Sequence, residues 1–142
     1  MSLSLFMKKN KKAKENVYFA ATKSLLDDKG KPLMWEIKPL STKEDEKIRD
    51  ACTIEVPIAG KAHMYRAKVN VNQYMTQLLV AAIVSPDLYN AELQDSYGVK
   101  TPEDLLKEMV NEPAEYTALT MFVQEVSGFN ISQDDKTDEA KN

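Results

Sequence analysis

Apolar and other residues alternate along two short segments in the N-terminal third of the chain, which is the period of a strand with one buried face. The alternating apolar positions are Val17, Phe19 and Ala21 in the first segment, and Leu33, Trp35 and Ile37 in the second. The turn-rich sequence DDKGKP lies between them and contains Gly30, which can take the positive φ of a tight turn. The pattern predicts a β-hairpin over residues 16–39, with the second apolar set on its buried face and Trp35 packed in the core.

A charged helix and a second pair of strands are predicted next. Ser41 and Glu44 have the spacing of a capping box, in which each side chain bonds the other residue's backbone N–H. The residues after them are mostly charged, so we expect this helix to lie on the surface. The sequence TIEVPI, residues 53–58, predicts an edge strand because Pro57 cannot donate to a ladder, and residues 64–69 predict a short return strand.

The strongest helical pattern starts at Asn70, with Gln73 at the third position as its capping-box-like partner. Apolar residues then recur at three- and four-residue steps, and these are Val71, Tyr74, Met75, Leu78, Leu79, Ala82 and Ile83. Ser85 precedes Pro86, which disfavours helix there and ends the element. We expect this helix to be the central, buried one.

Two further helices are predicted in the C-terminal half. Thr101 caps the first of them, and Pro102 takes its first helical position. The expected inward residues are Leu105, Leu106, Met109 and Val110 in that helix, and Tyr116, Leu119, Phe122, Val123 and Val126 in the next. Pro113 starts the second helix, and Gly128 stands where a left-handed residue closes a helix, with Phe129 placed to fold back onto the last turn.

Strands come first along the chain and helices follow, which predicts an α+β fold. We expect a small antiparallel sheet or hairpin in the N-terminal half, packed with a mainly helical C-terminal half. The chain divides into a flexible basic arm at 1–14, a single α+β domain at 15–129 and a disordered acidic tail at 130–142. Within the arm, residues 2–7 predict a short helical turn with an apolar patch.

The net charge of the 142-residue chain is −3, which argues against a general nucleic-acid binder. Cys52 is the only cysteine, so an intrachain disulfide is impossible, a cysteine-based zinc site is not expected, and a reducing compartment fits. The N-terminus lacks the apolar core of a signal peptide, and the longest apolar run, near residues 78–84, is too short to cross a bilayer. We expect a soluble, intracellular protein that contacts neither nucleic acid nor membrane.

Residues that could carry out catalysis are scarce. His63 is the only histidine and lies in a loop-like stretch without an evident partner, which favours an exposed, incidental side chain. Cys52 ends a helix, where the dipole opposes thiolate formation, so a small buried role is expected. The four glycines are far apart and no metal-binding motif occurs, so we predict no catalytic, cofactor-binding or metal-ligating residues and no enzymatic activity.

The sequence AELQDSYGV, residues 91–99, admits two interpretations. As a connector it would form one or two helical turns ending at a left-handed Gly98, with Val99 packed behind it. The apolar residues that would then turn inward are Leu88, Leu93 and Tyr97. As a partner-contact surface it would present Gln94, Asp95, Ser96 and Tyr97. The connector explains the polar members of this set less well, because other polar residues would serve there, so both interpretations stay open.

Followed by a Leu-Leu helix, AELQDSYGV resembles the signature of the XkdN-like phage tail assembly chaperone family. Other matching segments, in the expected order, are LMWEI at 33–37, RDACT at 49–53, QEV and GF between 124 and 129, and EAKN at 139–142. The resemblance covers almost the whole chain, and the lysine-rich stretch at 8–14 departs from the family pattern.

The resemblance implies a small phage protein that acts in the cytoplasm of the bacterial host and is absent from the mature virion. It implies binding to the tape measure protein, and to the tail-tube protein that assembles around it, during tail morphogenesis, with no catalytic residues. A long helical tape measure protein exposes apolar stripes before the tube encloses it, and a chaperone could cover them. The alternative is a small structural or regulatory component of the phage tail, and the oligomeric state stays open.

Overall fold

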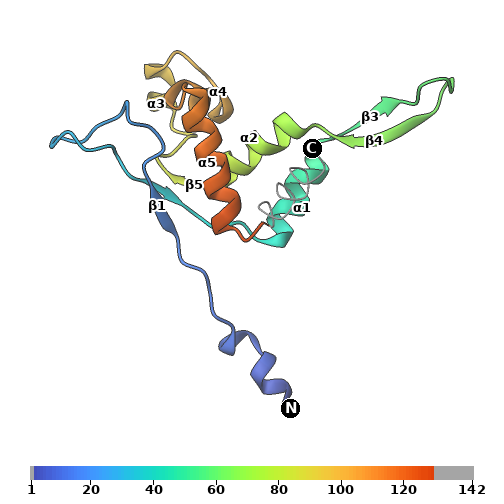
Figure 1. The fold of residues 1–142 in the computed structure, drawn as a ribbon, viewed down its shortest axis with the longest axis horizontal. Helices are drawn as coiled ribbons and strands as arrows, with labels where there is room; N and C mark the ends of the chain where they lie inside the picture. Colours follow the sequence, from blue (N-terminus) through green and yellow to red (C-terminus); the bar gives the residue numbers. More distant parts are fainter. Residues whose placement is uncertain (1, 130–142) are drawn as a thin grey trace, which may run out of the picture.

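Helix α2 (Val71–Ala82) forms the centre of the fold in the computed structural model, which describes residues 2–129. It packs against α1 (Thr42–Ala51), α4 (Pro102–Met109) and α5 (Pro113–Val126), as Figure 1 shows. The prediction of a central helix is confirmed, because six of its residues are buried. The inward position predicted for Val71 is wrong. Val71 is 58% exposed, because the first turn of α2 extends past the helices that cover the rest of α2.

A three-stranded antiparallel sheet lies beside these helices. Its order is β1 (Val17–Phe19), β2 (Trp35–Ile37) and β5 (Ile83–Ser85). The hairpin predicted over residues 16–39 is confirmed, because β1 pairs with β2 and Gly30 takes a φ of 79° in the turn. The buried position predicted for Leu33 is wrong: it is 42% exposed, and its N–H donates to Leu25 O within the loop, outside the β1–β2 ladder.

The hydrophobic periodicity of the sequence did not predict strand β5. Ile83 continued the helical pattern of α2, yet the helix ends at Ala82 and Ile83 pairs with Ile37 of β2. The overlooked signal is the sequence Ile-Val-Ser, rich in β-branched residues and directly before Pro86, which favours extended backbone. The central helix therefore runs straight into the third strand of the sheet.

Helix α1 lies on the surface, as its charges predict, and has no buried residue. The Ser41–Glu44 capping box is present in both directions. Tyr74 of α2 holds the helix in place, because its hydroxyl donates to the Asp45 carboxylate and accepts from the Arg49 guanidinium at 3.1 Å. The guanidinium also lies 4.8 Å from the centre of the Tyr74 ring, which adds a cation–π contact.

Strands β3 (Thr53–Pro57) and β4 (Tyr65–Val69) form a separate two-stranded sheet between α1 and α2, which confirms the predicted return strand. Figure 1 shows this hairpin reaching away from the helices, and we call residues 53–69 the projecting hairpin. At its end, Asn70 Oδ1 accepts from the Gln73 N–H at 3.2 Å. The reciprocal half of the predicted capping box is wrong, because the Asn70 N–H already donates to Cys52 O at 2.9 Å.

The C-terminal half is helical, with α3 (Ala91–Ser96) before α4 and α5. The predicted Thr101 cap and Pro102 start are confirmed, and so is the closing motif of α5, where Gly128 has a φ of 83° and the Phe129 N–H donates to Gln124 O. With small antiparallel sheets first and helices after them, the α+β prediction is confirmed. The predicted disordered tail, residues 130–142, lies outside the described residues.

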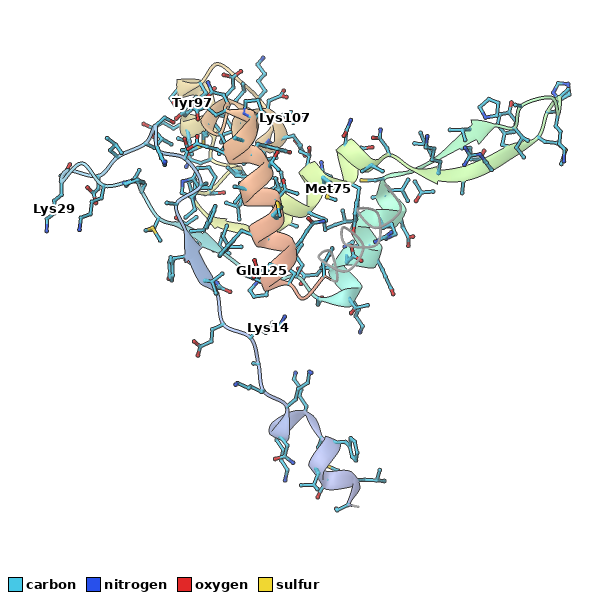
Figure 2. All side chains as sticks on the ribbon, viewed as in Figure 1. Lys14, Lys29, Met75, Tyr97, Lys107 and Glu125 are labelled. Atoms are coloured by element: carbon cyan, nitrogen blue, oxygen red, sulfur yellow. The ribbon has the colours of Figure 1, made fainter. Side chains whose placement is uncertain are left out.

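The N-terminal arm starts with two short 3₁₀ helices, η1 (Leu3–Phe6) and η2 (Lys8–Asn10), neither of which has a buried residue. The helical turn predicted within residues 2–7 is therefore present. Lys14 attaches the arm to the domain, because its Nζ donates to Val126 O at 3.1 Å. Figure 2 shows Lys14 beyond the C-terminal end of α5, close to Glu125, where a cation meets the negative end of the helix dipole.

Candidate partner-binding surface

The loop around α3 has the geometry expected of a connector. Asn90 Oδ1 caps the helix by accepting from the Leu93 N–H at 2.8 Å. At the other end Gly98 has a φ of 69°, and the Val99 N–H donates to Gln94 O at 3.1 Å, which closes a Schellman motif. Leu88 is fully buried, and the apolar residues that pack on the core around it are Leu93, Tyr97 and Val99.

The four residues predicted as a partner contact are divided by the structure into two pairs. Gln94 stabilises the loop, because its Nε2 donates to Leu88 O at 2.8 Å, and the half-buried Tyr97 packs against the core. Asp95 and Ser96 are exposed, and the Ser96 hydroxyl donates to Leu93 O of its own helix at 2.7 Å. Asp95 and Ser96 therefore face solvent, and a role for the four in partner binding stays a prediction.

These residues belong to a strongly acidic part of the chain. Residues 87–115, which we call the acidic segment, carry eight acidic and two basic side chains over α3, α4 and the first turn of α5. Figure 2 shows Tyr97 and Lys107 in this part of the molecule, on the side away from the projecting hairpin. A surface of this charge favours basic partners and disfavours a nucleic-acid backbone.

Within residues 2–129, ten of the fifteen large apolar side chains that are exposed lie on three segments that project from the helices, and the sequence analysis mostly assigned them no role. Figure 1 shows the course of these segments. The ten side chains are Leu3, Leu5, Phe6 and Met7 on the arm, Leu26, Leu33 and Met34 in the β1–β2 loop, and Ile54, Met64 and Tyr65 on the projecting hairpin. Apolar side chains grouped on protruding segments make these segments candidate surfaces for other proteins. For the projecting hairpin a signal was available in the sequence, because the two segments predicted as strands, 53–58 and 64–69, stand between two predicted helices with no further predicted strand beside them.

Reactive groups do not converge within residues 2–129. His63 is exposed at the end of the projecting hairpin, with a φ of 63°, and no three His, Cys, Asp or Glu residues in the described part could hold a metal ion. Cys52 is buried, as predicted, and this burial raises the pKa of its thiol. Burial and the hydrogen bond to Asp45 raise the pKa of Tyr74 to about 12, so its hydroxyl stays protonated. No helix of this part is long and apolar enough to span a bilayer.

Comparisons with known proteins agree with the resemblance seen in the sequence. The model of the phage XkdN-like tail assembly chaperone family matches residues 3–141. The chain is similar to the phage-like element PBSX protein XkdN of Bacillus subtilis (strain 168), with 21% identity over 140 residues that cover 99% of this chain and 93% of XkdN. YqbN of the same strain is also 21% identical, with the same coverage.

The crystal structure of YqbN has the same fold. It superimposes with a TM-score of 0.75 at 19% sequence identity, covering 92% of this chain and 98% of YqbN. At this identity the likeness shows the fold alone, and it does so over nearly the full length of both chains.

Proposed function

This chain belongs to the phage XkdN-like tail assembly chaperone family, whose members are not enzymes, and from this premise we propose that it binds the tape measure protein during tail morphogenesis. Before the tail tube encloses it, a long helical tape measure protein exposes apolar stripes to water. A chaperone that covers those stripes keeps the helix from aggregating. The tail-tube protein is the second partner, because it must replace the chaperone on the tape measure protein.

The observation that carries the proposal is the set of exposed apolar side chains on the three projections, each bordered by charged residues. An interface of this mixed kind excludes water from an apolar stripe and stays soluble at its rim. It also keeps affinity moderate, since binding must be reversed when the tube assembles. The protein then acts in the cytoplasm of the bacterial host and is absent from the mature virion.

The acidic segment supplies a second contact in this proposal. Asp95 and Ser96 face solvent at its surface, and Gln94 and Tyr97 hold the loop that presents them. This surface would meet basic residues of the tape measure or tail-tube protein through charge complementarity.

Co-expression with the cognate tape measure protein tests the proposal. We expect an affinity-tagged chaperone to keep the tape measure protein soluble and to co-purify with it, whereas the tape measure protein expressed alone should aggregate. Failure of the two proteins to co-purify would contradict the proposal. Mass spectrometry of purified phage particles tests the alternative, because a structural or regulatory tail component would be found there and a chaperone would not.

A further inference from the structure

The projecting hairpin is the least covered part of the folded domain. No third strand pairs with β3 or β4 within residues 2–129, and every residue of the two strands is exposed or half-buried. A two-stranded hairpin with no cover is only marginally stable in water. A hairpin of this kind gains stability when another element lies on one of its faces.

One face of the hairpin combines an apolar row with a basic row. The register places Ile54 opposite Lys68 and Val56 opposite Arg66, and residues that are directly opposite share a face. The apolar row therefore follows β3 and the basic row follows β4. The other face carries Glu55, the only acidic residue between 53 and 69. The apolar–basic face is formed by Ile54, Val56, Arg66 and Lys68.

The two cations of this face have no partner in the part of the chain that the structure describes. Neither Arg66 nor Lys68 forms an ion pair or a side-chain hydrogen bond with residues 2–129, while the acidic segment lies on the other side of the helices. Two unpaired cations beside an apolar row attract a ligand that has carboxylates along one edge of an apolar stripe.

The spacing of the rows matches a helix. Residues two apart on a strand are about 6.8 Å apart, and residues four apart on a helix are about 6 Å apart along its axis. Carboxylates at positions i and i+4 of a helix can therefore meet Arg66 and Lys68 together, while a neighbouring apolar row covers Ile54 and Val56. The five-residue strands are about 17 Å long, which matches about 11 helical residues.

A pocket at the base of the hairpin gives this face a fixed anchor point. Its volume is about 260 Å³, and its lining includes Ile54, Val56 and Lys68 together with the exposed Val71 of α2. Such a pocket accepts one large apolar side chain, and Lys68, which lines the pocket, can pair with a carboxylate next to that side chain.

We propose that the apolar–basic face binds an acidic amphipathic helix of the tape measure protein. The proposal rests on the proposed function, since it takes the tape measure protein as the client. It adds which face binds, that the bound segment is helical, and that glutamate or aspartate residues border the apolar stripe of that segment.

The test is a charge reversal, R66E with K68E, in the full chain co-expressed with the tape measure protein. The matched control is K43E with K47E, which reverses two exposed lysines of α1, outside the three projections, and changes the net charge equally. We expect R66E/K68E to weaken tape measure binding roughly tenfold at low salt, and K43E/K47E to leave it nearly unchanged. Circular dichroism checks that both variants keep their helix content.

Changes in the client complete the test. Replacing glutamates with lysines beside an apolar stripe of the tape measure protein should restore its binding to R66E/K68E, which only a direct charge contact explains. If wild type binds the tape measure protein and R66E/K68E binds equally well, the hairpin proposal is overturned and the proposed function stands. If wild type does not bind it, the proposed function fails. Hairpin-dependent self-association in sedimentation, or hairpin-dependent binding of an RNA oligonucleotide, would assign the face to another occupant and overturn the proposal.

Discussion

The two hairpins of this protein share antiparallel pairing and differ in what surrounds them. In the β1–β2 hairpin, Trp35 and Ile37 are buried in the core, and Phe19 stacks on Phe122 of α5 with ring centres 4.3 Å apart. In the projecting hairpin no strand residue is buried. The first hairpin therefore contributes to the stability of the domain, whereas the second leaves apolar and basic side chains free for a partner. The same backbone arrangement serves folding in one place and, in the proposal above, binding in the other.

The largest expected effect is a difference between the two hairpins in what each contributes to the free energy of unfolding. Trp35→Ala removes a side chain that is almost fully buried and should lower the free energy of unfolding by about 3–5 kcal/mol. Tyr65→Ala removes an exposed aromatic side chain of the projecting hairpin and should cost less than about 0.5 kcal/mol. Urea denaturation followed by circular dichroism measures both. Similar losses of unfolding free energy in the two variants would contradict the claim that the β1–β2 hairpin contributes more to stability than the projecting hairpin.

A smaller effect is expected where the projecting hairpin joins the helices. Tyr74→Phe removes the hydroxyl that links Asp45 and Arg49 of α1 to α2, the two helices that flank the hairpin. We expect a loss of about 1–2 kcal/mol in urea denaturation, because the lost hydrogen bonds involve charged groups. Tyr89→Phe is the matched control, since its exposed hydroxyl has no hydrogen-bond partner in the described part of the chain. An equal loss in the control would contradict the role of the Tyr74 hydroxyl.

The stability of the fold at acidic pH should depend on the loop of the β1–β2 hairpin. Hydrogen bonds from the Thr22 hydroxyl and the Lys23 N–H, each 2.7 Å long, lower the pKa of Glu115. A carboxyl group whose pKa is lower in the folded state than in the unfolded state stabilises the fold. This contribution is complete at pH values above the ordinary pKa of a glutamate. This contribution is lost as the pH falls through the lowered value.

Glu115→Gln should therefore reduce the fall in the thermal midpoint between neutral and acidic pH, at some cost in stability at pH 7. Glu55→Gln in the projecting hairpin makes the same charge change and removes no side-chain hydrogen bond within the described residues, so it should leave the pH profile unchanged. Identical profiles for Glu115→Gln and wild type would show that this contact does not contribute.

The smallest effect on stability is expected at α3. Asp95→Asn combined with Ser96→Ala changes two exposed side chains, so the free energy of unfolding should move by less than about 0.5 kcal/mol. If these residues contact a partner, capture of the tape measure or tail-tube protein should nevertheless weaken. Unchanged capture of both proteins would leave the loop as a connector only.

Much of the fold could be predicted because its local signals agree with its packing. Ser41, Thr101 and Gly128 mark helix ends by chemistry that acts within a few residues, and all three act as expected. The predictions for Ile83 and Leu33 are wrong because an apolar residue satisfies more than one period, and only tertiary pairing decides between them.

The proposed binding surface was harder to predict from the sequence than the core. The α3 loop has a distinctive mixture of polar residues, yet the Gln94 side chain in it donates to a backbone carbonyl of the same loop. The apolar–basic face of the projecting hairpin arises only when β3 and β4 are paired in register, which places Val56 opposite Arg66. In the sequence, each strand alone resembles an ordinary edge strand. The surface that the two strands form together is therefore evident only from their pairing in the structure.

The contact between Lys14 and the end of α5 also has a practical consequence. An ideal side-chain carbon on Gly128 would lie 3.2 Å from Lys14 Nζ, so the chain enters the domain at Lys14 close to where α5 closes. A fluorescent label near residue 14 and one near residue 129 would therefore report from nearly the same point. Energy transfer from either label to a dye at the tip of β3–β4 should give similar distances, which provides an internal check when the hairpin is tracked during client binding.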